Sequence, residues 1–141
     1  MEFKFVASLV AVAVAAALFT GCSNSLSAKP QTSSPNSTSK YVRITPEEAK
    51  NRMDKNPKAI ILDVRTKDEF SQKHIPKAIL VPNETIKDTP PAELPDKNAE
   101  ILVYCRSGNR SKQAAQKLIA MGYTNVLDFG GIGDWPYETT K

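Results

Sequence analysis

One short stretch of the chain places a cysteine among arginines and a glycine, a combination suited to nucleophilic chemistry. Cys105 opens the segment Cys-Arg-Ser-Gly-Asn-Arg-Ser, which has arginines at positions 106 and 110. A cysteine is a nucleophile only as its thiolate, and nearby positive charge lowers the thiol pKa from its usual value of roughly 8.5. The segment therefore predicts an activated thiol at Cys105, against the alternative of a cysteine that is only a small buried apolar side chain.

The sequence on either side of this segment predicts the elements that would position the thiol. The apolar run 101–104 is typical of a buried strand in a parallel sheet. After the segment, a helix that Gly122 ends is predicted by the spacing of four apolar residues, Ala114, Ala115, Leu118 and Ile119. Cys105 would then lie at the carboxyl edge of the sheet, where ligands bind, and the helix N-terminus would point at its sulfur.

The residues between the strand and the helix are expected to form an anion-binding loop. Gly108 and Asn109 are residue types that adopt unusual backbone angles, so the loop can turn its N–H groups inward. Cys105 is the expected nucleophile. The expected substrate-binding residues are Arg106, Ser107, Gly108, Asn109, Arg110 and Ser111.

Strand and helix patterns alternate over the last hundred residues, which predicts a parallel α/β sheet. Thr-Pro-Glu-Glu at 45–48 and Thr-Lys-Asp-Glu at 66–69 are typical helix starts. The proline-rich segment 82–98 is expected to hold a short helical turn at 84–87 and otherwise to be an exposed connection. Residues 130–135 are expected to form a glycine-rich turn. The expected strands are 41–44, 59–64, 78–81, 101–104 and 125–128.

The cysteine loop resembles the active-site loop of rhodanese-like sulfurtransferases. In that family the cysteine takes up a sulfane sulfur, becomes a persulfide and passes the sulfur to an acceptor. The resemblance continues in Leu-Asp-Val-Arg at 62–65, His-Ile-Pro at 74–76, and Gly-Gly at 130–131 with Trp135. It implies a rhodanese-like domain over 41–141, with a small parallel sheet of about five strands covered by helices on both faces.

Loop length separates this resemblance from a phosphatase interpretation. Four residues lie between Cys105 and Arg110, whereas low-molecular-weight cysteine phosphatases and arsenate reductases have five. The resemblance therefore implies a pocket too small for phosphate. The sequence departs from the family at Lys73 and Lys77, where glycine is common, which leaves the local backbone angles in question.

Four residues of the resembling segments are expected to support the site without reacting. Asp63 can accept backbone N–H groups at a strand end, and Arg65 can pair with Asp63 or Glu69 or line the pocket mouth. His74 is expected to be a structural hydrogen-bonding residue, and Trp135 either covers the site or closes the core. No cofactor and no metal are expected, because the domain has too few histidine and cysteine ligands.

The N-terminal part of the chain predicts targeting. Residues 1–21 read as a signal peptide, since the apolar run 6–19 is shorter than the roughly 20 residues of a membrane span. Leu-Phe-Thr-Gly-Cys at 18–22 resembles a bacterial lipobox, with phenylalanine where leucine is usual, and implies a lipid on Cys22. An ordinary secretory signal stays open. Residues 22–40 are rich in serine, threonine and proline and are expected to be a disordered tether. The expected location is extracytoplasmic, in a bacterial cell envelope or periplasm, with a lipid anchor in the membrane.

Charge and the cysteine loop together set the functional expectation. The net charge of +4 is modest and does not indicate nucleic acid, whereas Arg106, Arg110 and Lys112 suit a small anion such as thiosulfate. We expect a monomeric sulfurtransferase that stores sulfur as a persulfide on Cys105 and gives it to cyanide or a thiol. The alternative is an envelope redox or protein-binding module of the same fold that uses Cys105 in mixed disulfides.

Overall fold

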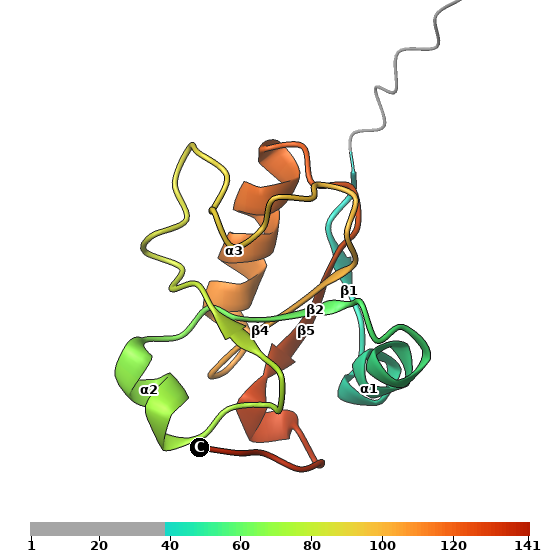
Figure 1. Cartoon of the computed structure of the whole chain (residues 1–141), viewed down its shortest axis with the longest axis vertical. Coiled ribbons are helices and arrows are strands. Elements are labelled where there is room, and N and C mark those ends of the chain that lie inside the picture. Colours follow the sequence, from blue (N-terminus) through green and yellow to red (C-terminus); the bar gives the residue numbers. More distant parts are fainter. Residues whose placement is uncertain (1–38) are drawn as a thin grey trace, which may run out of the picture. The chain divides into compact units, whose positions relative to one another are not determined.

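The computed structural model describes residues 39–141, so the predicted signal peptide, Cys22 and the tether up to residue 38 lie outside the described residues. Strands and helices alternate through the described part (Figure 1). In chain order the elements are β1 Val42–Arg43, α1 Pro46–Lys55, β2 Ile60–Asp63, α2 Lys67–Gln72, β3 Ile79–Leu80, β4 Ile101–Cys105, α3 Asn109–Ala120, β5 Val126–Gly131 and the 3-10 helix η1 Ile132–Asp134.

All strands of the described part join in one parallel sheet with the order β1-β5-β4-β2-β3. This confirms the predicted small parallel sheet of about five strands. β4 lies at its centre and pairs with β2 on one side and β5 on the other. Cys105 is therefore the last residue of the central strand, at the carboxyl edge of the sheet.

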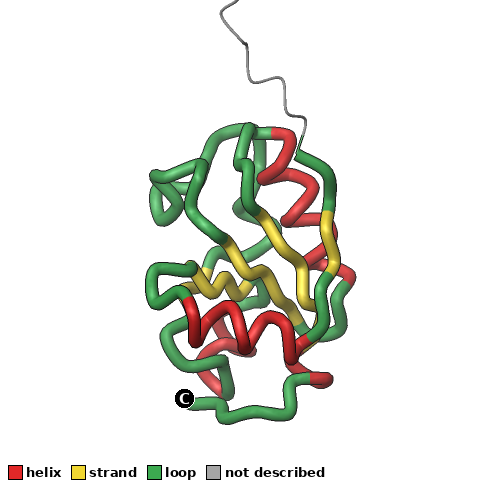
Figure 2. The backbone as a smooth tube through the Cα atoms, turned by 90° about the vertical axis from the view of Figure 1, so that its right-hand side faces the viewer, coloured by secondary structure: helices red, strands yellow, loops and turns green. Residues whose placement is uncertain are grey.

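The side chains of β4 alternate between two apolar clusters, one on each face of the sheet. Val103 and Cys105 pack in a cluster with Ala114 and Leu118 of α3. Leu102 packs in the other cluster, which contains residues of α1, β5 and η1. Helices therefore cover both faces, as predicted, and Figure 2 shows α1 in front of the strands (yellow).

The helices begin in two different ways. Thr45 and Thr66 cap α1 and α2 as predicted, since their hydroxyls accept the N–H groups of Glu48 and Glu69. The residue before α3 is Gly108 instead, with a φ of 95° and no side-chain cap. Because no side chain occupies the N-terminus of α3, its first backbone N–H groups remain directed at the cysteine loop.

The segment 82–98 differs from the expectation in two respects. The helical turn predicted at 84–87 is wrong: residues 82–85 instead form a hydrogen-bonded turn, in which the Thr85 N–H donates to the Pro82 carbonyl at 2.9 Å. The segment is also not simply exposed, because Ile86 and Leu94 are buried in the cluster on the α3 face. Ile86 and Leu94 thus attach the segment to the core, although local sequence patterns predict only an exposed loop there.

The C-terminal glycines do not form the predicted turn. Gly130 and Gly131 belong to β5 and pair with Tyr104 and Cys105 of β4. A β-bulge shifts the register of this pairing between Val103 and Tyr104. The last residues of β5 therefore stay paired with the last residues of the central strand β4. Only η1 remains of the expected turn, because the pairing with β4 extends the strand.

The two lysines that replace family glycines differ in their backbone. Lys77 has a φ of 66°, the left-handed conformation that glycine adopts most readily. Lys73 has a φ of −166°, which is ordinary extended backbone. Only the turn at Lys77 therefore carries the backbone strain that the substitution suggests.

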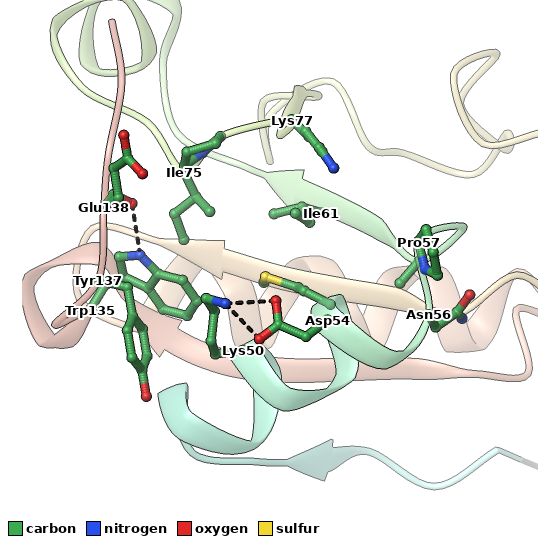
Figure 3. Close-up of a pocket in the computed structure, with 13 residues that line it drawn as sticks. Lys50, Asp54, Asn56, Pro57, Ile61, Ile75, Lys77, Trp135, Tyr137 and Glu138 are labelled. Atoms are coloured by element: carbon green, nitrogen blue, oxygen red, sulfur yellow. Dashed lines mark hydrogen bonds and ion pairs between the residues drawn. The ribbon is translucent and has the colours of Figure 1, made fainter.

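Trp135 closes the core on the α1 face, away from Cys105. It is 8% exposed and packs with Phe129 and Tyr137. A pocket of about 370 Å³ lies beside it, with Ile61 and Ile75 in its wall (Figure 3). Trp135 thus belongs to the cluster opposite the thiol, which favours the core-closing role over the site-covering one.

Residues 39–141 contain neither a candidate membrane span nor a candidate metal site. No helix there is long and apolar enough to cross a membrane. No group of three or more histidine, cysteine, aspartate or glutamate residues is arranged to hold a metal ion in the same part of the chain.

Candidate active site

The sulfur of Cys105 lies under the turn of its own loop. The Gly108 N–H donates a hydrogen bond to Sγ at 3.1 Å. The Ser111 hydroxyl lies 3.6 Å from Sγ, and Cys105 itself is buried. The loop that follows β4 therefore folds back so that polar hydrogens surround the sulfur, as predicted for an anion nest.

Ser111 connects the loop to the neighbouring strand. Its hydroxyl is 3.1 Å from the carbonyl of Gly108 and 3.4 Å from the carbonyl of Gly130 on β5. The side chain is completely buried, so these are its available partners together with Cys105. A thiolate at Cys105 gives this hydroxyl a charged acceptor, and hydrogen bonds to charged groups are the stronger ones.

The surroundings lower the pKa of the Cys105 thiol. Burial alone would raise it, but this is outweighed by hydrogen bonds from Ser111, through its N–H and hydroxyl, and from the N–H groups of Ser107 and Gly108. The sequence predicted a lowered pKa from the two arginines and the helix N-terminus, together with an anion-binding loop whose N–H groups turn inward. The structure assigns most of the effect to backbone N–H groups and one hydroxyl, which are closer to the sulfur.

Arg110 is held by a carboxylate. Its two terminal nitrogens lie 2.7 and 2.8 Å from the two carboxylate oxygens of Glu69 on α2. Hydrogen bonds from Arg110, opposed by burial and supported by Thr66, lower the pKa of Glu69 to about 2. A charge interaction with Cys105 also contributes to the raised pKa of Arg110. Arg110 therefore makes an ion pair with Glu69 and also interacts electrostatically with the Cys105 thiolate.

Arg106 is exposed. With Ser107 it lines a cavity of about 520 Å³, whose wall also includes Arg65, Glu69 and Lys73. Among residues 39–141, no carboxylate lies within ion-pair distance of Arg106. The cavity thus has more positive than negative side chains and an arginine available to an anion. Asn109, at the first position of α3, is exposed as well.

Asp63 and Arg65 form a buried pair beside this cavity. Arg65 Nη2 lies 2.6 Å from Asp63 Oδ2, and Arg65 also donates its backbone N–H to Asp63 Oδ1 at 2.9 Å. Nη2 donates in addition to the carbonyl of Lys73 at 2.6 Å. Of the partners that the sequence left open, the structure selects Asp63 over Glu69.

His74 is held away from the sulfur. Its Nδ1 lies 2.9 Å from the carbonyl of Phe70, and its ring stacks on the Phe70 ring with centroids 3.8 Å apart. Its backbone exchanges two hydrogen bonds with Thr140. These contacts suit the structural role expected for His74, which stays a prediction.

Sequence reasoning missed the close contact between β5 and the loop. A Cβ on Gly131 would lie 2.5 Å from the carbonyl oxygen of Arg106 and 2.8 Å from the Cα of Ser107. These are backbone atoms that cannot move aside, so this position requires glycine. It also missed Asp128, which is fully buried in β5. A carboxylate within the apolar run 126–129 was the available signal, because buried charges need partners.

The comparisons with known proteins agree with this geometry. A family model for the rhodanese-like domain matches residues 45–136. The thiosulfate sulfurtransferase PspE of Escherichia coli is 40% identical over 73 residues, covering 52% of this chain and 70% of PspE. A solved structure described as a rhodanese with anions from E. coli is 36% identical with a TM-score of 0.55, covering 59% of this chain and 98% of the other.

A longer relative matches only in part. The adenylyltransferase and sulfurtransferase UBA4 of Candida albicans is 41% identical over 100 residues, which cover 66% of this chain. The chain spans 23% of the length of UBA4. The similarity to UBA4 therefore concerns one segment of a larger protein.

Proposed function

Because this chain belongs to the rhodanese-like family, we propose that it is a sulfurtransferase that carries sulfur as a persulfide on Cys105. The donor is a sulfane compound such as thiosulfate, and the acceptor is a thiophile such as cyanide or a thiol. One observation carries the proposal: Sγ of Cys105 accepts the Gly108 N–H at 3.1 Å within a set of donors that lower the thiol pKa. Homology to sulfurtransferases supports the same chemistry.

The reaction divides into two displacement steps. In the first, the Cys105 thiolate attacks the outer sulfur of thiosulfate, the S–S bond of thiosulfate breaks, and sulfite leaves with the electron pair. In the second, cyanide attacks the outer sulfur of the persulfide, thiocyanate forms, and the thiolate is restored. No external oxidant or reductant is needed. A covalent intermediate between two products predicts ping-pong kinetics.

The loop residues have distinct parts in this scheme. The N–H groups of Ser107, Gly108 and Ser111 stabilise negative charge on the thiolate and then on the persulfide, which is the logic of an oxyanion hole applied to sulfur. Arg106 attracts the anionic donor into the cavity that it lines. The scheme needs no general base once Cys105 is ionised, so it assigns no proton transfer to His74.

Intact mass measurement tests the proposal directly. The protein is incubated with thiosulfate and then with cyanide, beside a Cys105→Ser variant. We expect a gain of about 32 Da, one sulfur atom, that cyanide removes and that the variant never shows. A reduced, alkylatable Cys105 that gains no mass would contradict the thiosulfate reaction. A protein trapped on Cys105 as a mixed disulfide would instead support the redox or binding module.

We further propose that the protein is anchored outside the cytoplasm by a lipid on Cys22. The support is the lipobox resemblance of residues 18–22, which precede a serine-rich stretch. Diacylation provides secure anchoring, because membrane affinity grows by about 0.8 kcal/mol for each buried CH₂. Cell fractionation of the wild type and of Cys22→Ser tests this. Equal recovery of both from the membrane fraction would contradict the anchor.

A further inference from the structure

Arg43, at the end of the edge strand β1, lies directly against two glycines of the cysteine site. A Cβ on Gly108 would lie 3.0 Å from Nη1 of Arg43, and a Cβ on Gly130 would lie 2.5 Å from Nη2. One guanidinium therefore covers both Cα atoms. The Arg43 side chain is half exposed, so it forms the outer layer over this side of the loop.

The backbone of both glycines takes part in the hydrogen bonds around the thiol. Gly108 donates its N–H to Sγ at 3.1 Å. The carbonyl of Gly130 is 3.4 Å from the hydroxyl of Ser111, which itself lies 3.6 Å from Sγ. Both glycines have a left-handed φ, 95° and 93°, so neither position favours a side chain of its own. Arg43 supplies the packing that the glycines lack.

Asp128 fixes the orientation of Arg43. Its Oδ2 lies 3.3 Å from Nη1 of Arg43 and accepts the Tyr41 hydroxyl at 2.6 Å. Its Oδ1 accepts the N–H of Gly130 at 2.9 Å. The carboxylate is fully buried, and a buried charge is retained only with partners that satisfy it. Asp128 therefore ties Arg43 and Gly130 to one another.

We propose that Arg43 is a positioning residue of the active site: oriented by Asp128, it packs against Gly108 and Gly130 and keeps the Gly108 N–H directed at Cys105. Glycine has the greatest backbone freedom of any residue, so an uncovered Gly108 would turn its N–H away for part of the time. The use of Arg43 in sulfur transfer rests on the proposed function. Its effect on the thiol does not.

The thiol is the direct reporter of this contact. A lost N–H···S⁻ hydrogen bond destabilises the thiolate and leaves the neutral thiol almost unaffected, so the pH at which Cys105 ionises must rise. Other charged groups at this edge of the sheet come from the loop, β2, α2, α3 and β5. They include Arg106, Asp63, Arg65, Glu69, Lys73, Arg110 and Asp128. Glu84 of the segment 82–98 also acts on Arg110 through its charge, and all of these groups remain in an Arg43 variant.

The experiment measures the rate at which iodoacetamide alkylates Cys105 across about pH 5 to 10, with no sulfur donor present. Peptide mass analysis follows Cys105 separately from Cys22. In Arg43→Met we expect the midpoint of the rate profile to rise by about one pH unit, the worth of one hydrogen bond to a charged group. Arg43→Lys keeps the charge without the planar group and should recover part of the shift.

Arg52→Gln is the matched control. Arg52 also bridges carboxylates, with nitrogens 2.8 Å from Glu48 and 2.9 Å from Glu100. Glu100 precedes β4 at the end opposite Cys105, so loss of this arginine should leave the alkylation profile unchanged. Thermal unfolding is measured for each variant. It separates a general loss of stability from a change in the loop, which the alkylation profile reports.

An Arg43→Met midpoint equal to that of the wild type would overturn the proposal. If that variant does not fold, Asp128→Asn decides: its single amide oxygen can still accept the Gly130 N–H and its NH2 group can donate to the Tyr41 hydroxyl oxygen, while the hold on Arg43 is weakened. A smaller upward shift is expected there, and no shift would again overturn the proposal. A wild type that takes no sulfur from thiosulfate, with the Arg43 shift present, would contradict the proposed function alone.

Discussion

Two of the arginine–carboxylate pairs at the carboxyl edge of the sheet differ in burial and in sequence distance. Asp63 and Arg65 are two positions apart, with side chains 0% and 5% exposed. Glu69 and Arg110 are 41 positions apart, and both side chains are 25% exposed. The two pairs share their chemistry, with nitrogen–oxygen distances of 2.6 and 2.7 Å.

The difference indicates separate functions for the two pairs. Arg65 contacts Asp63, the Lys73 carbonyl and the ring of Tyr104, so it fixes the backbone between β2 and β3. Arg110 joins the active-site helix α3 to α2 through a pair that solvent reaches. A partly exposed pair is weak enough for an anionic substrate to compete for its arginine, whereas a buried pair is not.

Breaking the buried pair should have the largest effect on stability. Arg65→Met leaves the carboxylate of Asp63 buried without its charge partner, and we expect unfolding free energy to fall by about 3–5 kcal/mol. Urea denaturation measures this. The double variant Asp63→Asn with Arg65→Met should recover part of the loss. A loss below about 1 kcal/mol would remove the distinction between the two pairs.

Breaking the exposed pair should cost less and change substrate binding. Glu69→Gln should lower the unfolding free energy by about 1 kcal/mol. The same substitution removes a negative charge from the cavity and frees Arg110, so the KM for thiosulfate should fall about fivefold with kcat little changed. Thr45→Ala, which removes the equivalent helix cap of α1 without a bond to Glu69 or Arg110, is the control. An unchanged KM would show that Arg110 does not assist donor binding.

Acid should release the exposed pair in a defined pH range. The pKa of Glu69 is lowered to about 2 in the folded protein, from about 4.3 in an unfolded chain. A lowered folded pKa contributes stability that is present above the unfolded value and is lost as the pH falls toward the folded value. The difference in unfolding free energy between wild type and Glu69→Gln should therefore shrink from about 1 kcal/mol at pH 6 toward zero near pH 2. A difference independent of pH would contradict this assignment.

The smallest expected effect concerns the geometry of the exposed pair. Arg110→Lys keeps the positive charge but cannot make two parallel hydrogen bonds to Glu69. We expect a loss of about 0.5 kcal/mol, which for a domain of this size lowers the unfolding temperature by about 2–4 °C. Differential scanning calorimetry is sensitive enough for this. A decrease as large as that of Arg65→Met would mean that the two parallel hydrogen bonds between Arg110 and Glu69 are essential for the stability of the fold.

Local patterns in the sequence predicted most elements of the fold. The caps at Thr45 and Thr66 and the helix end at Gly122 follow from residues three or four positions apart, which a linear pattern can show. The segment 82–98 and the end of β5 were mispredicted for the opposite reason. Ile86 is buried by distant residues on the α3 face, and Gly130 is a strand residue only because it pairs with Tyr104.

The candidate site divides in the same way. The sequence placed Cys105 at the carboxyl end of a central strand, and the structure has it there. It did predict the inward backbone N–H groups that lower the pKa of Cys105, but it did not identify the Ser111 hydroxyl as a further donor to the thiolate, nor the partner of Arg110, which comes from another helix. The roles predicted for the remaining site residues stay predictions.

The sequence by itself determined the reactive group, the loop that surrounds it and the alternation of strands and helices, because these depend on neighbours in the chain. Only the tertiary structure decided that Glu69 holds Arg110 and that Arg43 covers Gly108 and Gly130. Those contacts join positions far apart in the sequence, and they form only when the parallel sheet places β1 beside β5 and α2 beside α3. The sequence shows which reactive side chains are present, whereas the packing of the fold determines which residues contact them.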